Sequence, residues 1–167
     1  RKKFRVRIYA QKLTLDTPEI WLEKKEKYEM LVSKKRMPLS FKEYDSLMHG
    51  SYFEVLKGHH EFDDMTTRSM RPLIEVRYQR EPLYWPHQSD IRITFDSRLE
   101  AAKNVDLRFS RIFHDVSPHQ TIMEVKFRTA LPHWFRTILK DHDLERTTFS
   151  KYGRSVERIY RYHPIPR

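Results

Sequence analysis

This chain of 167 residues contains no cysteine and only three glycines. Without cysteine it can form no disulfide bridge, thiol nucleophile or cysteine-ligated metal site, which fits a reducing compartment. It also lacks the glycine-rich phosphate loop, the dinucleotide fingerprint and the nucleophile elbow. No stretch approaches the roughly 20 apolar residues that a membrane-spanning helix needs. Most familiar nucleotide-binding and hydrolase frameworks are therefore excluded.

Positive charge is abundant. Lys and Arg number 33 against 23 Asp and Glu, so the formal net charge is +10. Such an excess favours anionic partners: nucleic acid, phosphate compounds or a membrane surface. Aromatic residues make up 13% of the chain, which is typical of a folded domain and not of a disordered basic tail.

Several segments alternate charged and apolar residues with a period of two. Residues 4–9, 90–96 and 122–128 show this pattern clearly, and residues 32–36 show it more weakly. Since neighbouring side chains of a strand point to opposite faces, Arg5 and Arg7 should share a face, as should Arg92 and Asp96. Glu124 and its neighbours at i+2 and i+4 should do the same. Strands of this kind, placed side by side, make a sheet with one apolar and one cationic face.

The expected fold class is α+β, with one domain over residues 1–167 and a mainly antiparallel sheet. Strands are predicted at 3–10, 20–28, 30–37, 73–82, 90–97, 105–113 and 121–128. Helices are predicted at 40–57, 63–70, 131–141 and 150–162. Ser40 and Glu43 form a capping box, and Ser150 is a suitable cap for the last helix. The helices should cover the apolar strand faces, so the basic faces either line a closed tunnel or form an open platform.

A family resemblance enters through a series of short motifs. They are Lys3–Tyr9, Glu23–Lys25, Lys34–Arg36, Tyr78–Arg80, Asp90–Asp96, Glu124–Phe127 and Phe149–Tyr152. In this order they resemble the polyphosphate polymerase domain of the vacuolar transporter chaperone (VTC) complex and its bacterial relatives. That domain is one of the CYTH-like triphosphate tunnel metalloenzymes. The resemblance implies an antiparallel β-tunnel with flanking helices. It also implies an enzyme that transfers the γ-phosphate of ATP onto inorganic polyphosphate.

The resemblance assigns roles to individual side chains. Basic residues would line the tunnel as its catalytic set: Arg5, Arg7, Lys25, Lys34, Arg36, Arg80, Arg92 and Lys151. Among them, Arg5, Arg7, Arg80 and Arg92 would hold the nucleotide phosphates. Glu124 would bind the divalent cofactor, Mn²⁺ or Mg²⁺.

Two departures from the family pattern stand out. The family begins with a strand that carries further glutamates and a lysine, and nothing here corresponds to it, so we expect an N-terminally incomplete domain. Lys24 is a charge where the family usually has an apolar residue.

Other functions remain open. A tunnel-type triphosphatase would hydrolyse tripolyphosphate or a nucleoside triphosphate, and a non-catalytic module would bind polyphosphate or nucleic acid. ATP and polyphosphate are the expected partners, together with a membrane protein at the cytosolic face of a membrane. Nucleic acid is not expected, because the aromatic residues near the basic strands mostly alternate to the apolar face and are not placed for base stacking. The group His59, His60, Glu61, Asp63 and Asp64 lacks metal-ligand spacing, and a structural role is expected for it.

Overall fold

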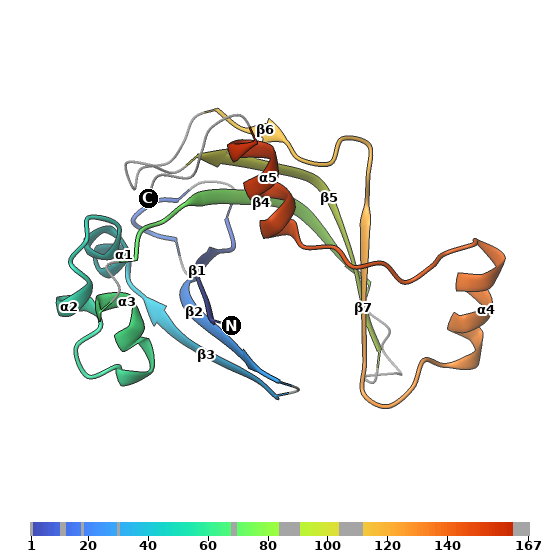
Figure 1. The fold of residues 1–167 in the computed structure, drawn as a ribbon, viewed down its shortest axis with the longest axis horizontal. Helices are drawn as coiled ribbons and strands as arrows, with labels where there is room; N and C mark the ends of the chain where they lie inside the picture. Colours follow the sequence, from blue (N-terminus) through green and yellow to red (C-terminus); the bar gives the residue numbers. More distant parts are fainter. Residues whose placement is uncertain are drawn as a thin grey trace. The chain divides into compact units, whose positions relative to one another are not determined.

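The computed structural model describes residues 2–10, 13–17, 19–29, 31–67, 70–83, 91–103 and 112–161. The chain forms two compact units, Arg1–Pro72 (unit 1) and Leu73–Arg167 (unit 2), which are described separately. Figure 1 shows the elements of both units. Each unit contains an antiparallel sheet with helices beside it, so the α+β class with flanking helices is confirmed.

The sheet of unit 1 has the strand order β1-β2-β3, with β1 at Lys2–Ile8, β2 at Ile20–Tyr28 and β3 at Leu31–Leu39. All its pairings are antiparallel. Ile20 and Leu22 of β2 lie directly opposite Leu39 and Met37 of β3, and all four are buried. The alternation therefore gives this sheet one apolar face, as the sequence predicts.

Short helical segments follow β3: α1 at Phe41–Met48, α2 at Tyr52–Val55, the 3₁₀ turn η1 at His60–Phe62 and α3 at Asp63–Thr67. Their buried residues are Leu47, Met48, Leu56, Phe62 and Met65. Lys24, on the apolar face of β2, donates to the carbonyl of Glu61 in η1 at 2.7 Å. These segments therefore cover the apolar face of the unit 1 sheet.

The single helix predicted over residues 40–57 is wrong, because the chain breaks it into α1 and α2. The capping box at its start is present, with Ser40 and Glu43 bonded to each other as expected. Gly50 then takes φ = 90°, a left-handed conformation that glycine adopts without steric cost. Its N–H donates to Leu47 O, and the N–H of Ser51 donates to Ser46 O. This is the bonding of a Schellman motif, which terminates a helix.

The sheet of unit 2 is built on one long central strand. β5 (Ile91–Lys103) pairs with β4 (Ile74–Leu83), with the short β6 (His114–Asp115) and with β7 (Ile122–Phe127), in every case antiparallel. The register with β4 shifts between Arg77 and Gln79. There β5 carries one extra residue, and Arg98 within this bulge has φ = 51°.

Two helices complete unit 2: α4 at His133–Asp141 and α5 at Lys151–Tyr160. Phe135 of α4 packs on Ile91 and Ile93 of β5, with partly buried apolar residues around them. Helix α5 lies on the opposite face of the sheet. Its first residue, Lys151, contacts Asp96, and near its end the ring of Tyr160 contacts Lys103. Ser150 caps α5 by accepting from the N–H of Gly153 at 3.1 Å, as predicted.

Most predicted strands lie within one to three residues of the observed bounds, although β5 continues six residues beyond its predicted end. Residues 104–111, which make up most of the predicted strand 105–113, lie outside the described residues, and residues 112 and 113 are not in a strand. Residues 30, 68, 69, 90 and 162, at the edges of other predicted elements, also lie outside them. No helix within the described ranges is long and apolar enough to span a membrane.

Candidate functional site

The polar face of the unit 1 sheet carries three successive cross-strand rows. Residues directly opposite each other share a face, so the register fixes the rows as Lys3, Lys25 and Lys34, then Arg5, Glu23 and Arg36, then Arg7, Trp21 and Pro38. These rows hold six cations and one carboxylate. The first row places three lysines side by side, and like charges in that arrangement repel one another. An anion bound above the row would relieve this repulsion.

Glu23 organises the cations of this face. It lies on the central strand, and only 2% of its surface is exposed. Its carboxylate accepts a bond from Arg5 Nε and pairs with Lys34 Nζ at 2.9 Å and with Arg7 at 3.6 Å. Burial alone would raise the pKa of Glu23, but the bonds from Lys34 and Arg5 outweigh burial and hold it below the usual range. Glu23 is therefore charged at neutral pH.

Aromatic rings lie beside two arginines of the same face, so the expectation that the aromatic residues turn to the apolar face is wrong for Trp21 and Tyr9. The guanidinium of Arg36 is 5.0 Å from the centre of the Trp21 ring, and that of Arg7 is 5.5 Å from the Tyr9 ring. Contacts at this distance are cation–π interactions, which hold a guanidinium plane beside a ring. The predicted residues Arg5, Arg7, Lys25, Lys34 and Arg36 thus share one face of one sheet.

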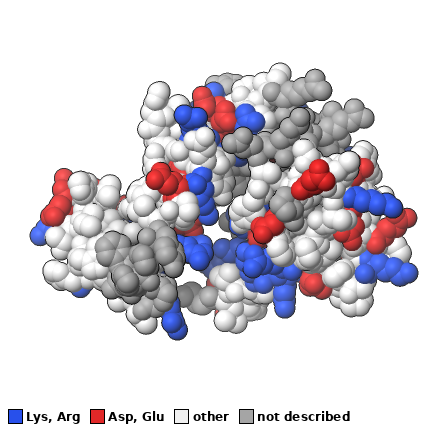
Figure 2. Space-filling model, turned by 180° about the vertical axis from the view of Figure 1, so that it is seen from behind, with Lys and Arg blue, Asp and Glu red and all other residues white. Residues whose placement is uncertain are grey.

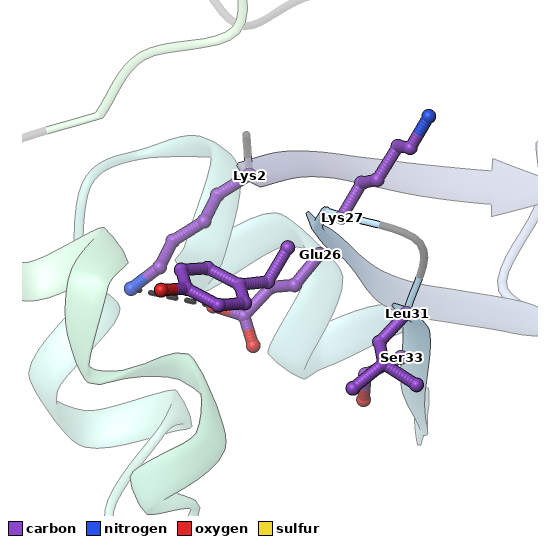
Figure 3. A pocket seen from close by; sticks show the side chains of 6 residues that line it. Lys2, Glu26, Lys27, Leu31 and Ser33 are labelled. Carbon is purple, nitrogen blue, oxygen red and sulfur yellow. Dashed lines mark ion pairs between the residues drawn. The ribbon is translucent and has the colours of Figure 1, made fainter.

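The opposite face of the unit 1 sheet uses its charges differently. Lys24 is buried and pairs with Asp64 at 3.1 Å, while Lys2 binds Asp64 at 2.7 Å and Glu26 at 3.3 Å. The unusual Lys24 is thus compensated by acids from its own strand and from α3. A pocket of about 270 Å³ lies on this side, lined by Lys2, Glu26, Lys27, Tyr28, Leu31 and Ser33 (Figure 3). Its lysine Lys2 is already paired with two carboxylates.

In unit 2, Asp96 is the buried acid that binds several cations, as Glu23 is in unit 1. Its side chain, on the central strand β5, has no exposed surface (0%). Arg80, directly opposite on β4, donates Nε to Oδ1 at 2.6 Å and Nη2 to Oδ2 at 2.7 Å. Lys151 of α5 places Nζ 2.6 Å from Oδ2. Burial raises the pKa of Asp96, but the bonds from Arg80 and Lys151 outweigh it and bring it below the ordinary value.

Glu124 of β7 lies beside this pair. Its side chain is 38% exposed and lies 3.1 Å from Lys126 Nζ and 3.3 Å from Arg80 Nη2. Burial opposes ionisation, but the bond from Lys126 and the nearby charges of Arg80 and Lys151 lower the pKa of Glu124. The half-exposed carboxylate is thus ionised and open to solvent.

The surroundings of Glu124 suit only one kind of metal site. Within the described ranges, no group of three or more His, Asp or Glu side chains could hold a metal ion. A cage made wholly of protein ligands is therefore not seen there. Mg²⁺ and similar hard cations are commonly held by one or two carboxylates, with phosphate oxygens and water completing the shell. Glu124 fits that role.

The remaining predicted residues of unit 2 lie on or beside the same face. Arg92 is exposed and lies directly opposite Lys126, one row away from Glu124. The ring of Tyr78 lies beside two cations, with its centre 5.4 Å from the Arg80 guanidinium and 5.1 Å from Lys151 Nζ. The structure thus groups Arg80, Lys151 and Glu124 closely, with Arg92 at the end of the group.

Sequence reasoning missed the central role of two acids, Glu23 and Asp96, and it did not assign Lys3 to the cationic face. Neither acid stands out in the sequence, because each shares its strand with a second acid, Glu26 or Glu100, and only the strand register shows which cations lie opposite. On the surface drawn in Figure 2, basic and acidic side chains likewise lie in mixed groups. Glu23 in unit 1 and Asp96 in unit 2 therefore hold the cations around them in place.

Comparison with known proteins places nearly the whole chain in one family. The family model described as the VTC domain matches residues 1–160. A search of curated proteins finds no match.

Proposed function

Because the chain belongs to the VTC domain family, which is associated with polyphosphate metabolism, we propose that it is the phosphotransferase domain of a polyphosphate polymerase. In this proposal it moves the γ-phosphate of ATP onto the end of an inorganic polyphosphate chain, with Mn²⁺ or Mg²⁺ as cofactor. The polar strand faces would line a tunnel for the phosphates. The work of the protein is then to bind, neutralise and align phosphates.

The observation that carries the proposal is the set of three cross-strand rows on the unit 1 sheet, with six cations around one buried carboxylate. A face of this kind attracts a chain of linked phosphates, because each row offers charge to a different phosphate group. Arginine forks bind phosphate oxygens in pairs, and lysines add single charges. Polyphosphate and the triphosphate of ATP share this repeating anionic chemistry.

Phosphoryl transfer suits such a face, because it needs alignment and charge neutralisation more than covalent help from the protein. Arg5, Arg7 and Lys34 would hold one length of phosphate chain, and Arg80, Arg92 and Lys151 another. The attacking group would be the terminal phosphate of polyphosphate, which is already anionic, so no strong general base is required. A divalent ion on Glu124 would, when bound, neutralise charge on the transferred group.

The proposal is tested by incubating the full-length protein with ATP and Mn²⁺ and resolving the products on a gel. Long polyphosphate that disappears on treatment with an exopolyphosphatase supports it. Orthophosphate as the sole product would identify a triphosphatase instead, and no turnover with tight polyphosphate binding would identify a binding module. A parallel reaction with EDTA shows whether the turnover needs a divalent metal.

A further inference from the structure

We propose that Asp96 is a positioning residue, whose buried carboxylate fixes the Arg80 guanidinium and the Lys151 ammonium in place for a substrate phosphate. The inference rests on the proposed function and deepens it. It assigns separate tasks to the two acids of unit 2: Asp96 orients the cations, and Glu124 remains available for a metal ion.

The first argument is the contrast between the two acids. Asp96 has no exposed side-chain surface and makes three contacts of 2.6–2.7 Å to Arg80 and Lys151. Glu124 is 38% exposed, and its contact with Arg80 is 3.3 Å. Removing one partner of a buried, hydrogen-bonded ion pair destabilises a protein strongly, because the other charge is left buried and unpaired. Breaking a long ion-pair contact near the surface changes the stability little. Arg80 is therefore anchored by Asp96 and not by Glu124.

The second argument concerns the edge of the Arg80 guanidinium that binds Asp96. Arg80 engages Asp96 through Nε and Nη2, in the side-on fork that suits a carboxylate. In the part of the chain that the structure describes, no partner is seen for Arg80 Nη1. Nη2 also donates to Glu124 Oε2 at 3.3 Å, so Nη1 is the part of the guanidinium left for a phosphate. Asp96 fixes the plane in which Nη1 lies.

The third argument is that one carboxylate binds two cations that come from different secondary-structure elements. Arg80 comes from β4 and Lys151 from the start of α5, and both bind Oδ2 of Asp96. The ring of Tyr78 lies 5.4 Å from the first cation and 5.1 Å from the second. Long, flexible side chains lose conformational freedom when they bind. Cations that Asp96 already holds in place would lose less conformational freedom when a phosphate binds, so the phosphate would bind more tightly.

The test measures the affinity for tripolyphosphate by calorimetry in EDTA, with no metal present and no turnover needed. Asp96→Asn keeps the shape of the side chain, but its amide presents a donor where an acceptor is required. We expect this variant to bind tripolyphosphate about tenfold or more weakly, equivalent to about 1.4 kcal/mol. The matched control is Glu100→Gln, because Glu100 accepts from Arg77 at 2.8 Å between the same two strands, outside the group around Asp96. It should bind like wild type.

Two further measurements separate positioning from a general structural role. In a background that carries both Arg80→Ala and Lys151→Ala, Asp96→Asn should change the affinity by less than about threefold, because residues that act through each other are not additive. Mn²⁺ should still raise the tripolyphosphate affinity of Asp96→Asn by the wild-type factor. In Glu124→Gln that enhancement should be lost. If Asp96 had only a structural role, Asp96→Asn would lower both the tripolyphosphate affinity in EDTA and the enhancement of that affinity by Mn²⁺.

Each outcome is decisive. Wild-type affinity in a folded Asp96→Asn variant would overturn the inference and leave the proposed function standing. Full additivity of Asp96→Asn with the combined Arg80→Ala and Lys151→Ala replacement would do the same. A wild-type protein that does not bind tripolyphosphate would overturn the proposed function itself. If Asp96→Asn does not fold, Arg80→Lys replaces it, because lysine keeps the charge but cannot form the fork with Asp96. An Arg80→Lys variant with wild-type affinity would then refute the inference.

Discussion

Replacing Glu23 by glutamine tests whether this buried acid holds the cationic face of unit 1 together. The amide of the Glu23→Gln variant could still accept one hydrogen bond, but it would lose the attraction to Arg5, Arg7 and Lys34. A hydrogen bond to a charged group contributes about 1.5–3 kcal/mol. Because the side chains of Arg5 and Lys34 are 55% and 44% exposed, solvent screens part of this attraction. We therefore expect a loss of about 2 kcal/mol in the free energy of unfolding at pH 7.

The pH dependence gives a second, independent readout. The folded-state pKa of Glu23 lies below its unfolded value, so its contribution is fully present above the unfolded pKa and is lost as the pH falls through the folded pKa. Protonated Glu23 is neutral, like the amide that replaces it in Glu23→Gln. The difference in stability between wild type and this variant should therefore shrink steadily below about pH 4. Urea denaturation at pH 7 and at several acidic pH values measures both quantities.

The control for this experiment is Glu157→Gln. Glu157 makes the same kind of ion pair, with Arg154 at 3.8 Å, but its side chain is 70% exposed. Exposed pairs contribute about 0–1 kcal/mol, so this variant should unfold almost like wild type. If Glu23→Gln were no less stable than Glu157→Gln, or if its deficit persisted unchanged at acidic pH, Glu23 would not be the centre of the cationic face.

Three more predictions concern the site and the fold. Glu124→Ala should abolish the Mn²⁺-dependent turnover of ATP while the circular dichroism spectrum stays native; turnover that survives would remove Glu124 from the mechanism. Arg5→Ala and Arg92→Ala should each weaken tripolyphosphate binding by about tenfold, near 1.4 kcal/mol, in calorimetry; unchanged affinity in both would refute the phosphate-binding roles proposed for these two arginines. Ser40→Ala should lower the unfolding free energy by about 1 kcal/mol through loss of the α1 cap; an unchanged urea midpoint would show that the capping box does not stabilise α1.

The sequence was most informative where one physical rule decides the outcome. Strand alternation has a fixed period of two, so the face shared by Arg5 and Arg7 could be predicted without any knowledge of neighbouring strands. The capping box at Ser40 is equally local, because its partner is three residues away. The family resemblance comes from the order of the short motifs along the chain, and amino-acid composition carries no information about that order.

The sequence was least informative where the outcome depends on strand neighbours or unusual backbone. Asp96 looks like any other charged residue of an alternating strand, and only the register with β4 shows that Arg80 lies opposite. The break after α1 depends on Gly50 taking a left-handed conformation inside an otherwise helical pattern. The bulge at Arg98 could not be foreseen, because arginine seldom adopts positive φ.

The bulge at Arg98 also determines how the insertion or deletion of one residue would affect the pairing of β5. Counting strictly by twos from Asp96 would bring Glu100 to the side of the sheet where α5 lies. The extra residue instead brings Leu99 and Ala101 there, and both are buried. Loss of one residue at Arg98 would restore plain alternation with the same two residues beneath α5. Gain of one residue would instead leave a second residue without a partner on β4, so evolution can shorten this strand here more readily than lengthen it.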